Sequence, residues 1–196
     1  MMTELLLTMG KWTWIIEFVS LCLFVGISIQ DKKVGSSVVA LLIVVVLGGL
    51  MRQYAPHLYA ITDPEYQAWV RFAWYMGFTA IYAFGMFILT KVHLTFMLRF
   101  SFMAKTVLFG YFVAGQLQLF RYAERAIGKT DYLQQVYQVG IPTINIGIAI
   151  TALFFAVVMV ISKIRIQQGK SLLLIKEKRG KCLFSNQQPQ TPITRV

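Results

Sequence analysis

Side chains able to perform chemistry are scarce in this chain, and their spacing assembles no catalytic set. Its 196 residues include eight acids, two histidines and two cysteines. An enzyme needs a nucleophile, a base or a metal-ligand cluster in a fixed arrangement, and the sequence contains neither an H-E-x-x-H pattern nor a P-loop. Cys22 and Cys182 have neither disulfide nor metal-ligand spacing. We therefore expect no enzymatic activity, no catalytic residue, no bound metal and no cofactor.

Two isolated charges lie within or beside apolar stretches, where an ion is costly. Glu17 interrupts the first stretch, and Arg71 follows the start of the third. A charged side chain at the centre of a membrane span costs about 2.5–3.5 kcal/mol on insertion scales and is usually paired or functional. Three interpretations are open: two charges that reach the interface separately, a structural ion pair, or a gating or proton-coupled role.

A second group of charges is basic and interleaved with aromatic residues. The segment "KVHLTFMLRFSFMAK", residues 91–105, contains Lys91, Arg99 and Lys105. On a single helix these three side chains would lie within about 120° of one another. We interpret the segment as an interfacial stretch that leads into a fourth helix, with the basic side chains reaching lipid phosphates. The lining of a pore is the alternative.

The third group is a basic tail, in which Glu177 is the only acid among eight basic residues from position 163 onward. Such a segment suits anionic lipid or an acidic partner protein. Direct nucleic-acid binding is disfavoured, because a short patch without a recognition fold is weak support for it. The candidate binding residues are Lys163, Arg165, Lys170, Lys176, Lys178, Arg179 and Lys181. The pattern fits a hairpin as well as a helix, and the last dozen residues are predicted to be disordered.

The elements that must position these groups are apolar helices. Only 14% of the chain is charged and 57% is hydrophobic, whereas a soluble domain is about 25% charged. Apolar runs of about 20 residues predict membrane-spanning helices. Five candidates are present, at 12–29, 35–51, 68–90, 100–120 and 140–162. The sequence therefore predicts an all-α, polytopic helical bundle over residues 1–162, followed by a basic tail over 163–196.

The number of spans is four or five, because Lys105 leaves only 106–120 of the fourth candidate free of charge. Basic residues next to spans remain in the cytoplasm, so the tail is expected inside. Five spans then put residues 91–99 and the turn at Lys32 and Lys33 inside as well, and the N-terminus and the loops 52–67 and 121–139 outside. Four spans would put that turn outside, which the charge rule disfavours.

The whole layout resembles the small polytopic membrane protein of the bacterial Kiwa anti-phage defence system. The likeness rests on apolar segments such as "SSVVALLIVVVLGGLM" and "GIAITALFFAVVMVIS", on the absence of an enzymatic motif and on the basic tail. This resemblance implies a homo-oligomer in the bacterial inner membrane that senses phage attack and works with a cytoplasmic DNA-binding partner.

The function expected from these features is that of a non-enzymatic membrane sensor or anchor. Small residues four apart, such as Gly110 with Ala114 and Gly147 with Thr151, favour close helix packing or oligomerisation. The basic inner face would recruit a soluble cytoplasmic partner. The alternative is a channel or transporter component that uses Glu17, Arg71 and the polar start of the fifth helix.

Overall fold

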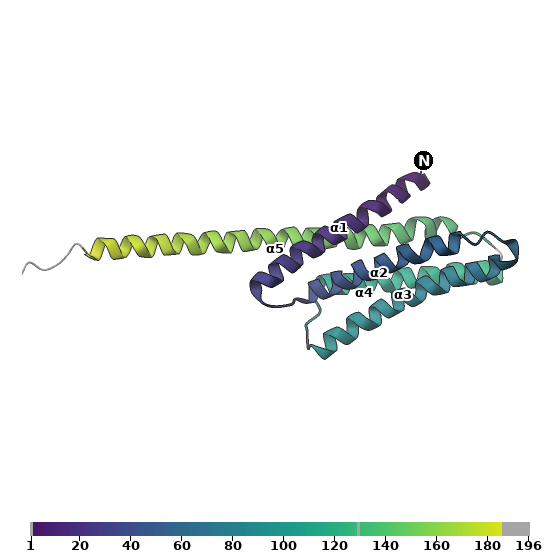
Figure 1. Ribbon diagram of the computed structural model, residues 1–196, viewed down its shortest axis with the longest axis horizontal. Coiled ribbons are helices and arrows are strands. Elements are labelled where there is room, and N and C mark those ends of the chain that lie inside the picture. The colour runs from purple at the N-terminus through teal and green to yellow at the C-terminus, as the bar shows by residue number, and fades with distance from the viewer. Residues whose placement is uncertain (1, 129, 186–196) are drawn as a thin grey trace, which may run out of the picture. The chain divides into compact units, whose positions relative to one another are not determined.

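The structure is a computed structural model that describes the backbone of residues 2–128 and 130–185, with side chains from 12 to 166 apart from 129. Within these residues the chain forms helices and no strand, which confirms the all-α prediction (Figure 1). A 3₁₀ turn, Pro64–Tyr66, precedes the third helix, and a π-helical turn, Glu124–Gly128, follows the fourth. The five α-helices are α1 (Met2–Asp31), α2 (Ser36–Tyr59), α3 (Gln67–Thr95), α4 (Phe102–Ala123) and α5 (Gln134–Ser185).

Four segments of the described chain are long and apolar enough to cross a membrane. They are Trp12–Asp31, Ser36–Tyr59, Pro64–Thr95 and Gln134–Ile166. Their exposed faces carry large apolar side chains, for example Phe84, Phe87 and Phe154, each more than half exposed. Water penalises such a surface and lipid does not. The protein is therefore an integral membrane protein.

The fourth helix, α4, is not among those four segments, because Lys105, Gln116 and Gln118 lower the hydropathy of its most apolar stretch. Its 22 residues nevertheless extend about 33 Å, which matches a hydrocarbon core of about 30 Å. It lies antiparallel to α3, as Figure 1 shows, and exposes Phe109 and Phe112 on its outer side.

Helix boundaries differ from the predicted ones chiefly by being wider. The second helix continues past 51 to Tyr59 although Pro56 lies inside it. The fifth begins at Gln134 and is helical through Ser185, so most of the basic tail is a helix and the hairpin alternative is wrong. The turn before α3 starts with a side-chain cap: the Asp63 side chain accepts a hydrogen bond from the Glu65 amide, 3.0 Å long, with Pro64 as the first residue of the turn.

Residue contacts divide the chain into two compact units, Met1–Ala156 and Val157–Val196. In the first unit, α1, α3 and the beginning of α5 run in one direction, and α2 and α4 run in the other. This unit therefore has two ends, the His93 end, where α3 stops and α4 starts, and the Arg121 end, where α4 stops and α5 starts. Between them the core includes Leu41, Leu89 and Val107, each fully buried.

Two glycines allow the helices to approach closely. A Cβ atom at Gly85 would lie 2.5 Å from Leu47 Cδ1 and 2.6 Å from Tyr111 Cε2, and one at Gly110 would lie 2.9 Å from Ile148 Cδ1. Neither position has room for a methyl group. The predicted close packing at Gly110 is thus confirmed, whereas Gly147 has nothing within 4 Å of the same added atom.

Candidate functional site

The His93 end is closed by a chain of hydrogen bonds that connects three helices. The Nδ1 atom of His93 lies 2.7 Å from the Leu89 carbonyl oxygen, which can only accept, so in the neutral imidazole Nδ1 carries the proton. Nε2 then accepts from the Ser36 hydroxyl at 2.6 Å. The Ser36 hydroxyl oxygen also accepts a hydrogen bond from the Ser101 backbone amide at 3.0 Å. The Ser37 hydroxyl donates a hydrogen bond to the Ser101 hydroxyl at 3.2 Å. The starts of α2 and α4 are thereby fastened to the last turns of α3.

Residues 91–105 do not form a single helix, so the condition under which their three basic side chains would share one face is not met. Lys91 lies in α3, Arg99 in the connection after it, and Lys105 in the first turn of α4, so the three charges do not share a helix face. His93 between them is only 1% exposed, and its ring stacks on Phe100 with 4.3 Å between centroids. Sequence reasoning missed this buried histidine, because its partners Ser36 and Ser101 are far away in sequence.

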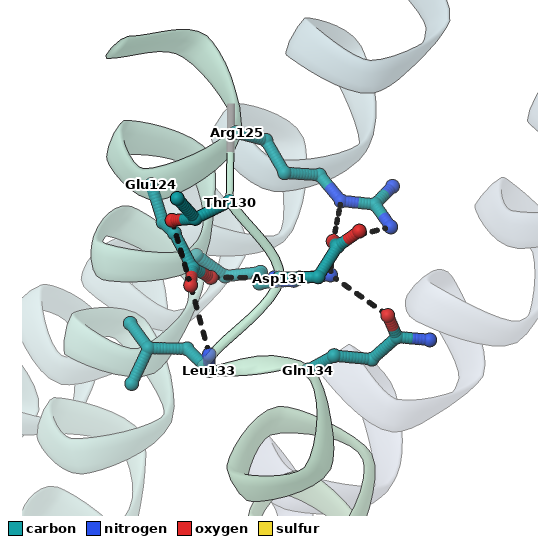
Figure 2. A network of polar contacts seen from close by, with 7 residues as sticks. Glu124, Arg125, Thr130, Asp131, Leu133 and Gln134 are labelled. Atoms are coloured by element: carbon teal, nitrogen blue, oxygen red, sulfur yellow. Dashed lines mark hydrogen bonds and ion pairs between the residues drawn. The ribbon is translucent and has the colours of Figure 1, made fainter. Parts of the chain in front are cut away.

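The Arg121 end is held by an ion-pair network around one buried guanidinium (Figure 2). Arg121, 2% exposed, donates to Glu124 and to Asp131 at 2.7 Å. Asp131 also pairs with Arg125 at 3.2 Å, and Glu124 accepts the Leu133 amide at 2.9 Å. Figure 2 shows how these contacts fold the residues after α4 back over its last turn.

The network lowers the pKa of both acids. Burial acts to raise the pKa of Glu124, but the Leu133 amide and the Arg121 guanidinium outweigh it and hold that pKa below its usual value. The hydrogen bond from Arg121 is the main cause of the lowered pKa of Asp131, and Arg125 adds to it. Both carboxylates are therefore charged over the physiological pH range.

A cavity of about 640 Å³ lies between the helices in the half of the bundle next to the Arg121 end. All five helices contribute to its wall, α1 through Thr13–Glu17 and α5 through Tyr137–Ile148. Its volume falls within the range of about 300–1,000 Å³ that is typical of small-molecule sites. The aromatic residues of its wall are Trp14, Tyr59, Trp74, Phe78, Tyr82, Tyr111 and Tyr137.

Three polar side chains in this wall are more than nine-tenths buried and have no hydrogen-bond partner among the described residues. They are Glu17, Tyr82 and Tyr111, with exposed fractions of 7%, 2% and 4%. Every fully enclosed side-chain oxygen or nitrogen in the described chain does have a partner, so these three retain contact with the cavity. Buried polar atoms are normally satisfied. The cavity thus presents one carboxylate and two phenol groups to whatever occupies it.

A second set of polar residues fixes the wall on the side of α5. The Trp74 indole donates to the Tyr137 hydroxyl at 3.1 Å, and that hydroxyl donates to the Gln118 side-chain oxygen at 3.0 Å. Asn145, one helix turn deeper than Ile141, is half-buried beside them. The contacts join α3, α4 and α5, so this part of the wall is preorganised.

Of the three interpretations of Glu17 and Arg71, the ion pair between them is absent from the ion pairs of the described residues. Arg71 is exposed on α3, and neither residue belongs to an ion pair within the described part of the chain. The cation that acts on Glu17 is Arg52 of α2, whose guanidinium lies 5.5 Å from the centroid of the Trp14 ring. Sequence reasoning missed Arg52 because it placed that residue in a loop beyond the end of the second helix.

The predicted tail residues are positioned only in part. Lys163 is half-buried and Arg165 is exposed, both in the second unit. The side chains of the remaining five candidates lie outside the described residues, although their backbone is helical: Lys170, Lys176, Lys178, Arg179 and Lys181.

No group of three or more His, Cys, Asp or Glu side chains that could hold a metal ion occurs among the described residues. Comparison of the chain with protein-family models, with characterised proteins and with solved structures gives no match. The site must therefore be interpreted from its own chemistry.

Proposed function

We propose that this protein is a non-enzymatic membrane sensor that binds a small ligand within the bundle and recruits a soluble partner through its basic last helix. The observation that carries the proposal is the cavity, because unsatisfied polar groups inside an apolar bundle suit a bound molecule. The fifth helix supplies Ile141–Ile148 to the cavity and is also the helix that contains the basic residues.

A sensor is favoured over a channel because the cavity occupies one half of the bundle only. Its wall residues come from the half beside the Arg121 end, whereas the other half is filled by core residues. Leu41, Leu89 and Ala104 are fully buried there, and the Ser36–His93 hydrogen bond closes that end. A permeation path needs a continuous polar or hydrated lining, and the apolar core residues described in that half favour the sensor instead.

The orientation that we propose has five passes. Since α4 lies beside α3 and returns the chain to the Arg121 end, a bilayer crossed by the four apolar helices is crossed by α4 as well. The charge rule then assigns the His93 end and the basic helix to the cytoplasm, in the bacterial inner membrane.

Two further parts of the proposal concern partners. An acidic cytoplasmic protein suits the charge of residues 163–181, and the open surface above Gly147 suits contact with a second copy of the chain. A role in phage defence, which the resemblance to Kiwa membrane proteins implies, stays a prediction that no family match supports.

Recruitment and conductance together test this proposal on the full-length protein. Replacing Lys176, Lys178, Arg179 and Lys181 by Gln should remove the proteins that co-purify in mild detergent, while the matched change of Lys32 and Lys33 to Gln should not. The purified protein in liposomes should conduct no ions above background. Conductance, or a co-purifying set that survives neutralisation of the basic helix, would contradict the sensor and favour the channel.

A further inference from the structure

We infer that the cavity beside the Arg121 end binds a lipophilic organic cation, such as a quaternary ammonium or phosphonium ion, with Glu17 as its counter-ion. This inference rests on the proposed function and names the chemical class of its ligand.

The first argument is charge complementarity. Glu17 is 7% exposed and lines the cavity, and its carboxylate belongs to no ion pair with a side chain that the structure describes. A carboxylate in an apolar bundle is costly unless it is compensated. A cation in the adjoining space would supply that compensation to the ionised carboxyl group.

The second argument is the aromatic wall. The rings of Tyr82 and Tyr111 lie 5.3 Å apart between centroids, and those of Trp74 and Phe78 lie 4.8 Å apart. The faces of aromatic rings attract cations, and the attraction grows when water is excluded. An ammonium or phosphonium ion that carries apolar groups would satisfy the rings and the carboxylate together, whereas an anion would satisfy neither.

The position of Arg52 is consistent with this assignment. Its guanidinium lies 5.5 Å from the centroid of the Trp14 ring, and its charge acts on Glu17 from the rim of the cavity. Gly48, one turn deeper on α2, faces the carboxyl group: a Cβ atom built there would lie 4.0 Å from the Glu17 Oε2 atom. The carboxylate therefore lies beside Gly48, and the space next to it is open to a ligand.

Binding to the full-length protein in lipid nanodiscs tests the inference with ions of matched shape. Tetraphenylphosphonium and tetraphenylborate have nearly the same size and opposite charge, and triphenylphosphine oxide is a neutral relative. Titrations that follow tryptophan fluorescence report on the site, because Trp14 and Trp74 line it. Protein-free nanodiscs give the lipid background. Saturable binding of the phosphonium, at least tenfold tighter than of the borate, is expected.

Variants locate the site and its charge. Glu17→Gln should weaken phosphonium binding about tenfold or more, which corresponds to about 1.4 kcal/mol, and should leave the phosphine oxide unchanged. Gly48→Leu should fill the cavity and abolish binding of both the phosphonium and the phosphine oxide. At Gly49 an added side chain would meet open space, so Gly49→Leu should change the binding of neither probe.

The outcomes separate this inference from the function on which it rests. Equal binding of phosphonium and borate, or an unchanged phosphonium affinity in Glu17→Gln, would overturn the cation assignment. If Gly48→Leu still abolished binding of the neutral probe, the ligand cavity of the proposed sensor would stand. Binding that Gly48→Leu does not affect would overturn both.

Discussion

His93 accepts a hydrogen bond from Ser36, a residue 57 positions earlier in the chain, with 2.6 Å between Nε2 and the hydroxyl oxygen. The contact joins the end of α3 to the first turn of α2 and closes the half of the bundle that has no cavity. Buried polar side chains are normally hydrogen-bonded. Substitution of His93 therefore tests whether α2 and α3 pack here as described.

Replacing His93 by Ala should destabilise the protein by about 3 kcal/mol, because a cavity forms and the Ser36 hydroxyl loses its acceptor. Thermal unfolding of the full-length protein in detergent measures the change. His57→Ala is the control, since His57 is exposed and should cost less than about 0.5 kcal/mol. Equal effects of the two changes would contradict the buried position of His93.

Arg121 should be far more important than its neighbour Arg125. Arg121→Ala leaves the Glu124 carboxylate, 9% exposed, without its cation, and we expect a loss of about 2 kcal/mol. The side chain of Arg125 is 33% exposed, so Arg125→Ala should cost less than about 1 kcal/mol. In the same unfolding measurement, a larger effect at Arg125 would show that the network is centred elsewhere.

Acid should weaken the Arg121 end. The pKa values of Asp131 and Glu124 are lowered in the folded protein, so their stabilising contribution is complete above the ordinary carboxyl pKa of about 4. It is lost as pH falls through the lowered folded values. Melting temperatures between pH 7 and pH 3 should therefore decline at the acid end, and less steeply in Asp131→Asn. An identical pH profile for that variant would contradict the ion pairing.

The close contact at Gly85 predicts opposite outcomes for two Gly→Ala changes. At Gly85 a methyl group would overlap Leu47 and Tyr111, and overpacking should cost about 2 kcal/mol. At Gly49 nothing lies within 4 Å, so alanine should be neutral or stabilise the helix by up to about 1 kcal/mol. Thermal unfolding of both variants in the same detergent measures the two changes in stability. An unchanged stability of Gly85→Ala would contradict the close packing of α2, α3 and α4.

The sequence predicted the order and approximate positions of the five helices, though not whether four or five of them are spans, because apolar runs and their polar boundaries are local features. The cap at Asp63 likewise depends on neighbouring residues only, since its partner is the Glu65 amide. The site was harder to predict, because Glu17, Tyr82 and Tyr111 come from three helices and are brought together by packing alone. Arg52 was assigned to a loop since Pro56 and the polar residues around it suggest an earlier helix end, whereas α2 continues through Pro56 to Tyr59.

The orientation of the bundle is the claim on which recruitment depends, and cysteine labelling in intact cells tests it most directly. With Cys22→Ser as background, Cys182 should react with a membrane-impermeant maleimide only after the cells are permeabilised. In a Cys22→Ser, Cys182→Ser chain, Thr62→Cys, in the exposed connection between α2 and α3, should react in intact cells. Prompt labelling of Cys182 in intact cells, with Thr62→Cys protected, would contradict a cytoplasmic basic helix and the recruitment of a partner there.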